Sequence, residues 1–511
     1  MSFLDDHQTE IFAFLSDPAT YGLGVPVKRI DTHGAAVFLA GPDVYKVKRA
    51  VRFSYMDFST LEKRRAACEA ELAINRCYAP ELYLDIVPIT RDADGYHLDG
   101  SGEAVEWAVH LRRFDEEATF DRIAGRGPLG SALVDKLARA VLASHRRVES
   151  RDAPRATASL HHILLDTLEE LAFEPRNLPV CDVEPVRTAL LSAFDKALPL
   201  LRQRAAAGFV RRCHGDLHLG NIALIGGEPV LFDAIEFDEA LATTDIFYDL
   251  AYLLMDLCER GLTGDANHLL NRYLEDCSPA EEAIEGIALL PLFLGLRAAI
   301  RAKVLAAQAR LGHGEEFWAE ARAYIAAARG FLEAAPSRLI VIGGLSGTGK
   351  SCLAAALAPL VGAPPGAIHL RSDIERKKLF GRMETERLPA TAYSDADTRR
   401  TYERLSTLAR SVLEAGSCVI VDATFRRFEE RTAIEKLAAA AGVAFTGIWL
   451  EAPLPVRMSR VADRRGDASD ATPDIARTQD EKDVGAVRWH RLDASRPLDL
   501  VVNSTLAKIA G

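Results

Sequence analysis

The segment from residue 344 to residue 351 reads GLSGTGKS and matches the phosphate-loop pattern GxxxxGK[ST]. An apolar run precedes it at 339–342 and a helical pattern follows it at 352–360, which is the context that this motif requires. In such a loop, backbone N–H groups point into one concavity at a helix N-terminus, the lysine reaches the β- and γ-phosphates, and the serine hydroxyl can bind Mg²⁺. The predicted nucleotide-binding residues are Gly344, Ser346, Gly347, Thr348, Gly349, Lys350 and Ser351.

Two carboxylates follow predicted strands of the same region. Asp422 ends the apolar run 417–421, where a carboxylate can hold the Mg²⁺ shell. Asp373 follows the run 367–370, at the edge of the sheet where open α/β sheets bind their ligands. An aspartate after an apolar strand is common in any α/β fold, and Asp373 could instead cap a helix over 374–380. Both structural alternatives stay open.

With these motifs, residues 336–511 resemble the small P-loop kinases that include polynucleotide kinases, zeta toxins and chloramphenicol phosphotransferases. The resemblance rests on the phosphate loop, a Ser-Asp-x-x-Arg element and a late arginine-rich segment. It implies that Asp373 accepts the proton of the acceptor hydroxyl and that Arg376 holds the substrate or its phosphate. An α/β P-loop NTPase domain with a mainly parallel sheet is the fold that it implies.

The late segment contains Arg457, Arg460 and Arg464, which are three and four residues apart and therefore share one face of a predicted helix. In the kinases that this region resembles, such a face closes over the nucleotide and neutralises charge on the transferred phosphoryl group. Arg460 and Arg464 are the predicted nucleotide ligands. The alternative is an ordinary basic face in contact with water.

A second chemical motif lies far from the phosphate loop. Residues 213–221 read CHGDLHLGN, and an apolar hairpin follows that ends at Asp233. The pattern HxDxxxxN, then a hairpin, then Asp is the spacing of a protein-kinase-type catalytic loop and its metal-binding strand. The form HGDLHxGN resembles aminoglycoside phosphotransferases and related small-molecule kinases, over about residues 1–335. The resemblance implies that Asp216 is the catalytic base and that Asn221 and Asp233 bind Mg²⁺.

The same resemblance requires a lysine that contacts the α- and β-phosphates of ATP, paired with a glutamate. Lys46 and Lys48 share one face of a predicted strand, and we favour Lys46 because apolar Val44 precedes it on that face. The helix predicted at 61–78 offers Glu69 or Glu71 as the partner, and the sequence leaves that choice open.

Acidic residues crowd the segment just after Asp233. Glu236, Asp238 and Glu239 either favour a cationic ligand or form an acidic loop in contact with water. Further on, Asp245 opens a segment that resembles the DPxxDLA helix start of the family, with isoleucine in place of proline. We expect Asp245 to be structural, as a cap or a loop anchor.

The elements that position these motifs are also predicted by the sequence. Short alternating runs predict an antiparallel sheet over 27–50, with turns at 33–34 and 41–43. A helix over 58–79 and strands at 82–89 and 105–111 complete a small β-rich lobe of about residues 1–115. Long Ala/Leu segments predict a helical lobe over about 116–335. The prediction is an α+β bilobal kinase-like domain, 1–335, followed by the P-loop domain, 336–511.

Composition limits the classes of function. The 511 residues carry 62 Lys and Arg against 73 Asp and Glu, and this net charge of −11 disfavours general nucleic-acid binding. The N-terminus is acidic rather than signal-like, and the longest apolar run, 287–296, is too short to span a bilayer, so no membrane association is expected. Eight scattered cysteines without metal-ligand spacing indicate reduced thiols and a cytoplasmic protein.

The sequence therefore predicts two ATP- and Mg²⁺-dependent kinase modules that each phosphorylate a hydroxyl of a small molecule. One alternative is an N-terminal kinase regulated by a C-terminal ATPase switch, and another is a nucleotide-binding scaffold without activity. The sequence leaves both acceptors and the oligomeric state open.

Overall fold

The structure is a computed structural model, which describes residues 6–32, 34–53, 56–150, 153–174, 176–277, 280–310, 314–464, 467–481 and 483–510. The chain forms two compact units. Unit 1 comprises Met1–Leu129, Arg139–Glu169 and Leu198–Asp256, and unit 2 comprises Gly130–Ala138, Glu170–Ala197 and Leu257–Gly511. Four helices have residues in both units: α4 (Ser131–Arg147), α5 (Ala153–Ala172), α6 (Val180–Ala206) and α8 (Ile246–Glu259). The domain boundary that we place near residue 336 stays a prediction.

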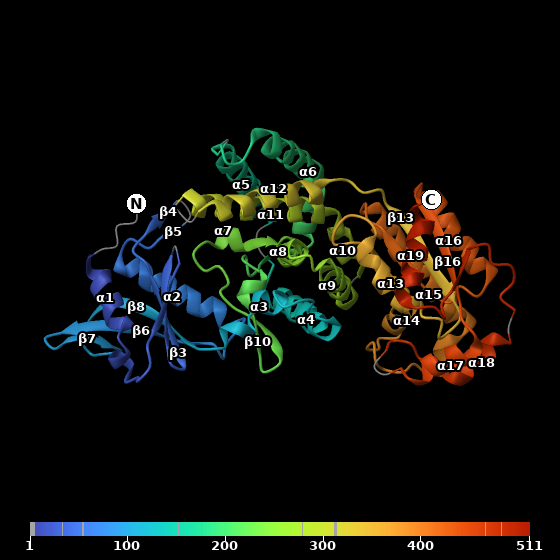
Figure 1. The fold of residues 1–511 in the computed structure, drawn as a ribbon, viewed down its shortest axis with the longest axis horizontal. Helices are drawn as coiled ribbons and strands as arrows, with labels where there is room; N and C mark the ends of the chain where they lie inside the picture. Colours follow the sequence, from blue (N-terminus) through green and yellow to red (C-terminus); the bar gives the residue numbers. More distant parts are fainter. Residues whose placement is uncertain are drawn as a thin grey trace. The chain divides into compact units, whose positions relative to one another are not determined.

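Unit 1 contains an antiparallel six-stranded sheet in the order β1-β2-β3-β8-β6-β7, drawn in blue in Figure 1. Its strands are β1 (Lys28–Asp31), β2 (Ala35–Ala40), β3 (Asp43–Lys48), β6 (Tyr83–Asp92), β7 (Gly95–Leu98) and β8 (Glu103–Arg112). The short hairpin of β4 (Arg52–Phe53) and β5 (Met56–Asp57) follows β3. The antiparallel sheet predicted over 27–50 is confirmed, although His33 of the first predicted turn lies outside the described residues.

Alternating side chains explain why this sheet carries a helix on each face. Ala108 packs in one core cluster with Phe12 of α1 (Asp6–Ser16), whereas the next residue, Val109, packs in another with Leu72 of α2 (Leu61–Asn75). Successive side chains of a strand point to opposite faces, so α1 and α2 cover opposite sides. Lys46 stands directly opposite Val109 in the ladder and therefore points to the α2 face.

Besides its parts of α4, α5, α6 and α8, the rest of unit 1 contains short elements around the predicted catalytic loop. β9 (Val210–Arg212) pairs with β12 (Thr243–Asp245), and β10 (Ile222–Ile225) forms a hairpin with β11 (Glu228–Leu231). The remaining short helices are η1 (Pro18–Tyr21), η2 (Glu116–Ala118), α3 (Phe120–Ala124), η3 (Leu219–Asn221) and α7 (Glu239–Ala242).

Unit 2 contains a five-stranded parallel sheet in the order β14-β15-β13-β16-β17. The strands are β13 (Arg338–Gly344), β14 (Ile368–Arg371), β15 (Val419–Asp422), β16 (Ala444–Glu451) and β17 (His490–Asp493). The helices between and after them are α13 (Lys350–Leu357), η6 (Ala358–Leu360), α14 (Ser372–Leu379), η7 (Ala390–Tyr393), α15 (Asp395–Glu414), α16 (Phe428–Ala441), α17 (Leu454–Ala462), α18 (Pro473–Asp480) and α19 (Leu498–Ala510). Helices cover both faces of a parallel sheet, and β13 accordingly is buried over most of its length. The mainly parallel α/β fold is confirmed.

Before this sheet, unit 2 contains α9 (Thr263–Asp276), α10 (Ala280–Glu285), η4 (Gly286–Leu289), α11 (Leu290–Gln308) and α12 (Glu315–Leu332). The stretch Ala283–Gln308 is long and apolar enough to cross a membrane, but 78% of its most apolar window is buried inside the protein. α11 packs against α12, where Gly295 lets Leu332 approach closely. This burial is typical of a core helix of a globular fold.

Candidate active sites

The first site is built on the loop that follows β9. The Asp249 carboxylate of α8 accepts hydrogen bonds from the backbone N–H groups of His214 (3.2 Å) and Gly215 (2.9 Å), which fixes the start of the loop. Gly215 has a φ of 85°, a conformation that favours glycine. The Asn221 amide nitrogen donates to the Asp216 backbone oxygen (2.9 Å) and to its carboxylate oxygen Oδ2 (3.1 Å). The structure therefore brings the predicted base and a predicted metal ligand together.

Two lysines of β3 meet one glutamate of α2. The Lys46 ammonium lies 2.8 Å from Glu71 Oε1 and 2.5 Å from Asp233 Oδ1, while the Lys48 ammonium lies 2.6 Å from Glu71 Oε2 and pairs with Glu236. Burial would lower the pKa of Lys46, but Asp233 and Glu71 raise it well above its usual range. Burial likewise opposes ionisation of Glu71, yet the two lysines lower its pKa to about 2.

This network resolves the choice of glutamate that the sequence left open. Glu71 is fully buried between the lysines, whereas Glu69 is exposed and pairs with Arg65. It also shows that neither interpretation of Glu236 was correct, because its side chain is buried and pairs with Lys48. Its neighbour Asp238 caps α7 through the N–H groups of residues 240 and 241.

Asp233 is held in place by its backbone. It has a φ of 62°, and its N–H donates to the Tyr83 hydroxyl (3.1 Å). The next residue, Ala234, donates its N–H to the Asn75 side-chain oxygen (2.8 Å) and accepts from the Asn75 amide nitrogen (3.3 Å). The Asp233 side chain remains 42% exposed, so its carboxylate faces an accessible space beside Lys46.

Mg²⁺ prefers oxygen ligands, and the donor set of this site is suitable. The amide nitrogen of Asn221 is committed to Asp216, which leaves its carbonyl oxygen as the atom that can bind a cation. The Asp233 carboxylate supplies a second, charged oxygen donor that Lys46 neutralises in this structure. Asn221 and Asp233 are therefore the residues that would hold the metal, which would supply positive charge to offset that of the nucleotide phosphates.

The second site is the phosphate loop between β13 and α13. Gly344, Gly347 and Gly349 have φ values of 144°, 87° and 89°, and a Cβ on Gly347 would lie 2.5 Å from the backbone oxygen of Arg457. The loop therefore requires glycine both for its conformation and for its packing. Within it, the Thr348 hydroxyl (2.8 Å) and the Lys350 ammonium (3.3 Å) donate to the backbone oxygen of Leu345.

Ser351 and Asp422 form the predicted metal-binding pair of this site. The Ser351 hydroxyl donates to Asp422 Oδ2 over 2.5 Å. Burial opposes ionisation of Asp422, but the neighbouring His369 side chain, 3.5 Å away, and the charge of Lys350 lower its pKa to about 2. Burial lowers the pKa of Lys350. A hydroxyl and an ionised carboxylate side by side fit the oxygen preference of Mg²⁺.

Asp373 lies in the first turn of α14. Burial and the neighbouring Asp422 charge raise its pKa, while Lys350 and a hydrogen bond from Ser469 act in the opposite direction. The helix begins at Ser372 and its N-cap residue is Arg371, so the alternative that Asp373 caps the helix is wrong. The structure thus places a partly buried carboxyl group within electrostatic reach of the loop lysine.

Arg376 does not lie where the prediction needs it. Its guanidinium donates to the backbone oxygen of Ala392 (2.9 Å) and lies over the ring of Tyr393, 4.8 Å from the ring centre. Only 7% of the residue is exposed. These contacts hold the short helix η7 against α14, which is a structural task that competes with contact to an acceptor.

The three late arginines also differ from the prediction of one helical face. α17 ends at Ala462, so Arg464 lies beyond the helix, 3.6 Å from Asp467. Arg457 is buried and pairs with Asp480, which excludes a fully hydrated basic face. Arg460 lies beside the phosphate loop, with Nη1 3.7 Å from the position of a Cβ on Gly349.

Comparisons with known proteins agree with this pair of sites. The model of the family described as "Phosphotransferase enzyme family" matches residues 40–287, and the model described as "AAA domain" matches residues 339–483. An uncharacterized protein of Mycobacterium tuberculosis (strain ATCC 25618 / H37Rv) is 30% identical over 482 residues, 91% of this chain and 92% of that protein. An uncharacterized protein of Mycobacterium bovis matches to the same extent.

The chain belongs to the phosphotransferase enzyme family. It is an ATP-dependent kinase whose phosphotransferase region is followed by an AAA domain with a P-loop.

Solved structures cover the two parts of this phosphotransferase separately. A choline/ethanolamine kinase family protein from Mesorhizobium loti is 15% identical, with a TM-score of 0.37, and the match covers 63% of this chain and 99% of that chain. The APS kinase of Mycobacterium tuberculosis is 24% identical, with a TM-score of 0.25, over 35% of this chain and 100% of that chain. These identities and scores carry no conclusion about substrates.

Several residues of the phosphotransferase sites escaped the sequence reasoning. In the first site these are Asn75, Tyr83, Lys48 as a second ion-pair partner, and Glu236. In the second they are His369, Arg371 and Gln479, whose side-chain oxygen accepts a hydrogen bond from the backbone N–H of Ser346 (2.8 Å). One sequence signal could have identified such residues: a polar residue at a position whose surroundings predict burial, such as His369 within an apolar strand.

Proposed function

We propose that this phosphotransferase is bifunctional: each of its two sites transfers the γ-phosphoryl group of ATP, bound with Mg²⁺, to a hydroxyl of a small molecule. The observation that carries the proposal is that both sites combine a candidate base with a lysine suited to contact phosphate and a carboxylate suited to bind Mg²⁺. Asp216 accompanies Lys46 and Asp233 in the first site, and Asp373 accompanies Lys350 and Asp422 in the second.

In the first site, Asp216 would accept the proton of the acceptor hydroxyl, oriented by the hydrogen bond from Asn221. Lys46, positioned by Glu71, would contact the α- and β-phosphates once it releases Asp233. When bound, the metal would neutralise phosphate charge and align the γ-phosphoryl group.

In the second site, the loop N–H groups and Lys350 would hold the phosphates, and Arg460 would add positive charge beside the loop. Asp373 would accept the acceptor proton. Its raised pKa suits a group that must take up a proton during the reaction.

Two further properties belong to the proposal. We propose small-molecule acceptors, rather than proteins or nucleic acids, in keeping with the net charge of −11. We also propose a cytoplasmic location, in keeping with eight cysteines that are scattered along the sequence without metal-ligand spacing.

The test compares Asp216→Asn with Asp373→Asn in the full chain, with ATP consumption measured across a panel of hydroxyl compounds. Each substitution is expected to lower phosphorylation of one set of acceptors by roughly 10²-fold or more while the other set is unaffected. ATP affinity should remain close to that of the unmodified protein, since neither aspartate holds the phosphates. ATP hydrolysis that no acceptor stimulates and that Asp373→Asn leaves unchanged would favour the regulatory ATPase over the second kinase.

A further inference from the structure

β14 is an edge strand of the parallel sheet, and its outer edge is covered by a helix. The order β14-β15-β13-β16-β17 gives β14 a strand neighbour on one side only, within the described part of unit 2. On the other side, the side chains of Asn267 and Asn271 of α9 make hydrogen bonds to backbone groups that a neighbouring strand would otherwise bind. Asn267 donates to the backbone oxygen of Ala367 (3.0 Å), and Asn271 accepts from the backbone N–H of His369 (2.7 Å) and donates to Ala367 (3.3 Å).

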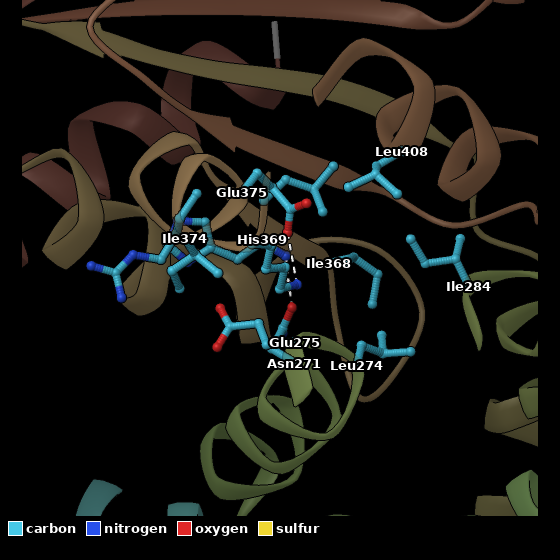
Figure 2. Close-up of a pocket in the computed structure, with 12 residues that line it drawn as sticks. Asn271, Leu274, Glu275, Ile284, Ile368, His369, Ile374, Glu375 and Leu408 are labelled. Atoms are coloured by element: carbon cyan, nitrogen blue, oxygen red, sulfur yellow. Dashed lines mark hydrogen bonds and ion pairs between the residues drawn. The ribbon is translucent and has the colours of Figure 1, made fainter. Parts of the chain in front are cut away.

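This arrangement is specific because the two asparagines are four residues apart, on one face of α9, and their amides match a backbone oxygen and N–H two residues apart on the strand. Figure 2 shows Asn271 beside His369 in the wall of a small pocket that is lined by residues of α9, α10, β14, α14 and α15. The edge strand is therefore fixed in position by side chains of α9.

The fixed strand leads directly to the phosphate site. His369 Nε2 is buried, lies 3.5 Å from Asp422 Oδ2, and makes no hydrogen bond among the described residues, so it is aimed at this carboxylate without being committed elsewhere. Two residues on, Arg371 pairs with Asp467 over 2.8 Å, and Asp373 follows in the first turn of α14. A shift of β14 along its edge would move the His369 ring away from the carboxylate that also binds Ser351.

A second set of contacts ties α9 to the same region. Arg272 pairs with Glu384, which also lies 3.6 Å from Arg371. α9 lies within residues 40–287, which match the phosphotransferase model, whereas β14 lies within the AAA domain at 339–483. The AAA domain thus takes the cover of its sheet edge from the preceding matched region.

We propose that Asn271 is a positioning residue of the second site: it holds His369 so that Nε2 orients Asp422 toward the metal-binding position. The proposal rests on the proposed kinase function only in so far as Asp422 and Ser351 hold Mg²⁺ there. On this proposal, α9 contributes to metal binding at the P-loop site in addition to packing against β14.

The test measures Mg²⁺ binding rather than turnover, in the full chain carrying Lys46→Met so that nucleotide binding at the first site is weakened. A fluorescent ATP analogue is titrated at increasing Mg²⁺ concentrations and also without Mg²⁺. Asn271→Ala and His369→Phe should each raise the Mg²⁺ concentration for half-maximal binding about tenfold, the scale of losing an outer-shell partner of a metal ligand. Affinity without Mg²⁺ should not change, because the loop and Lys350 hold the phosphates.

Three comparisons separate positioning from general stability. His268→Ala, on the same helix but paired with Asp135, should leave the Mg²⁺ dependence unchanged. His369→Gln, which keeps an N–H donor, should restore most of the Mg²⁺ affinity that His369→Phe loses. The double variant Asn271→Ala with His369→Phe should be no worse than His369→Phe alone, because both act through one contact.

An unchanged Mg²⁺ dependence in folded Asn271→Ala protein would overturn the proposal. So would an equal loss of nucleotide affinity with and without Mg²⁺, since that is the result of a loosened fold. Failure of the proposed function would look different: no hydroxyl compound would stimulate ATP consumption at the second site, while the Mg²⁺ measurements would still decide the role of Asn271.

Discussion

The two sites hold the lysines that we propose to contact phosphate in opposite ways. Lys46 is held by the carboxylates of Glu71 and Asp233, which raise its pKa well above the usual range despite burial. Lys350 donates to a backbone oxygen, and burial lowers its pKa. On the proposed function, the first site would exchange ion pairs when a nucleotide binds, whereas the second presents a loop whose lysine forms no ion pair with a carboxylate of the described residues. If both sites transfer phosphoryl groups as we propose, the same reaction can be supported by a lysine held in side-chain ion pairs or by one held by a backbone oxygen.

The largest expected effect concerns Lys350 of the second site, the lysine that a backbone oxygen holds. Lys350→Ala should lower turnover at the second site by roughly 10²- to 10³-fold, because the charge beside the β- and γ-phosphates is lost. Activity of the first site, measured on its own acceptors in the same protein, should be unchanged. Loss of both activities in a folded variant would show that the second site regulates the first.

The next prediction separates the two lysines of β3. Lys46→Met should lower activity of the first site by roughly 10²-fold with a small change in stability, because Glu71 keeps Lys48 as a partner and Asp233 can be hydrated. Lys48→Met should instead lower the free energy of unfolding by ~3 kcal/mol, since Glu236 is left buried without its cation. Turnover and thermal unfolding of both variants give the answer. Equal loss of activity at equal stability would mean that both lysines contact phosphate.

A third prediction sharpens the claim that the second site depends on backbone geometry. Gly347→Ala adds a Cβ at a φ of 87° and 2.5 Å from the Arg457 backbone oxygen, so it should weaken nucleotide binding there about tenfold or more. Gly226→Ala is the matched control in the hairpin of the first site, at a φ of 60° with nothing within 4 Å of the added atom. It should cost only local strain and leave nucleotide binding intact, as measured by titration with a fluorescent analogue.

The smallest effect concerns the pH dependence of stability in unit 2. Burial raises the pKa of Glu275 to about 7, although Arg371, Arg272 and Lys378 oppose this and Glu384 adds to it. The folded protein therefore holds a proton that the unfolded chain loses near pH 4.5, and stability should fall as pH rises from about 4.5 to 7, by at most ~1.4 kcal/mol per pH unit. Glu275→Gln should flatten this slope in urea unfolding between pH 5 and 7. An unchanged slope would assign the dependence to another group.

Local patterns were sufficient for the main motifs. The phosphate loop between a strand and a helix, and the HxDxxxxN loop before a hairpin, are specified within a few residues of chain, and the structure contains those elements at those positions. The same local reasoning failed for Arg464, because the helix ends at Ala462, and for Arg376, whose guanidinium contacts Ala392 sixteen residues away. Spacing predicts a shared face only while the helix continues.

The sequence by itself determined the fold class of both parts, the chemistry of each motif and the identities of the candidate bases and metal ligands, since each follows from residue types at short spacings. Only the tertiary structure decided which charges meet: Glu71 rather than Glu69 beside Lys46, Glu236 beside Lys48, and Asn271 on the edge of β14. These partners are separated by tens to hundreds of residues in the chain. Burial and long-range pairing, which give such contacts their strength, exist only once the chain has folded.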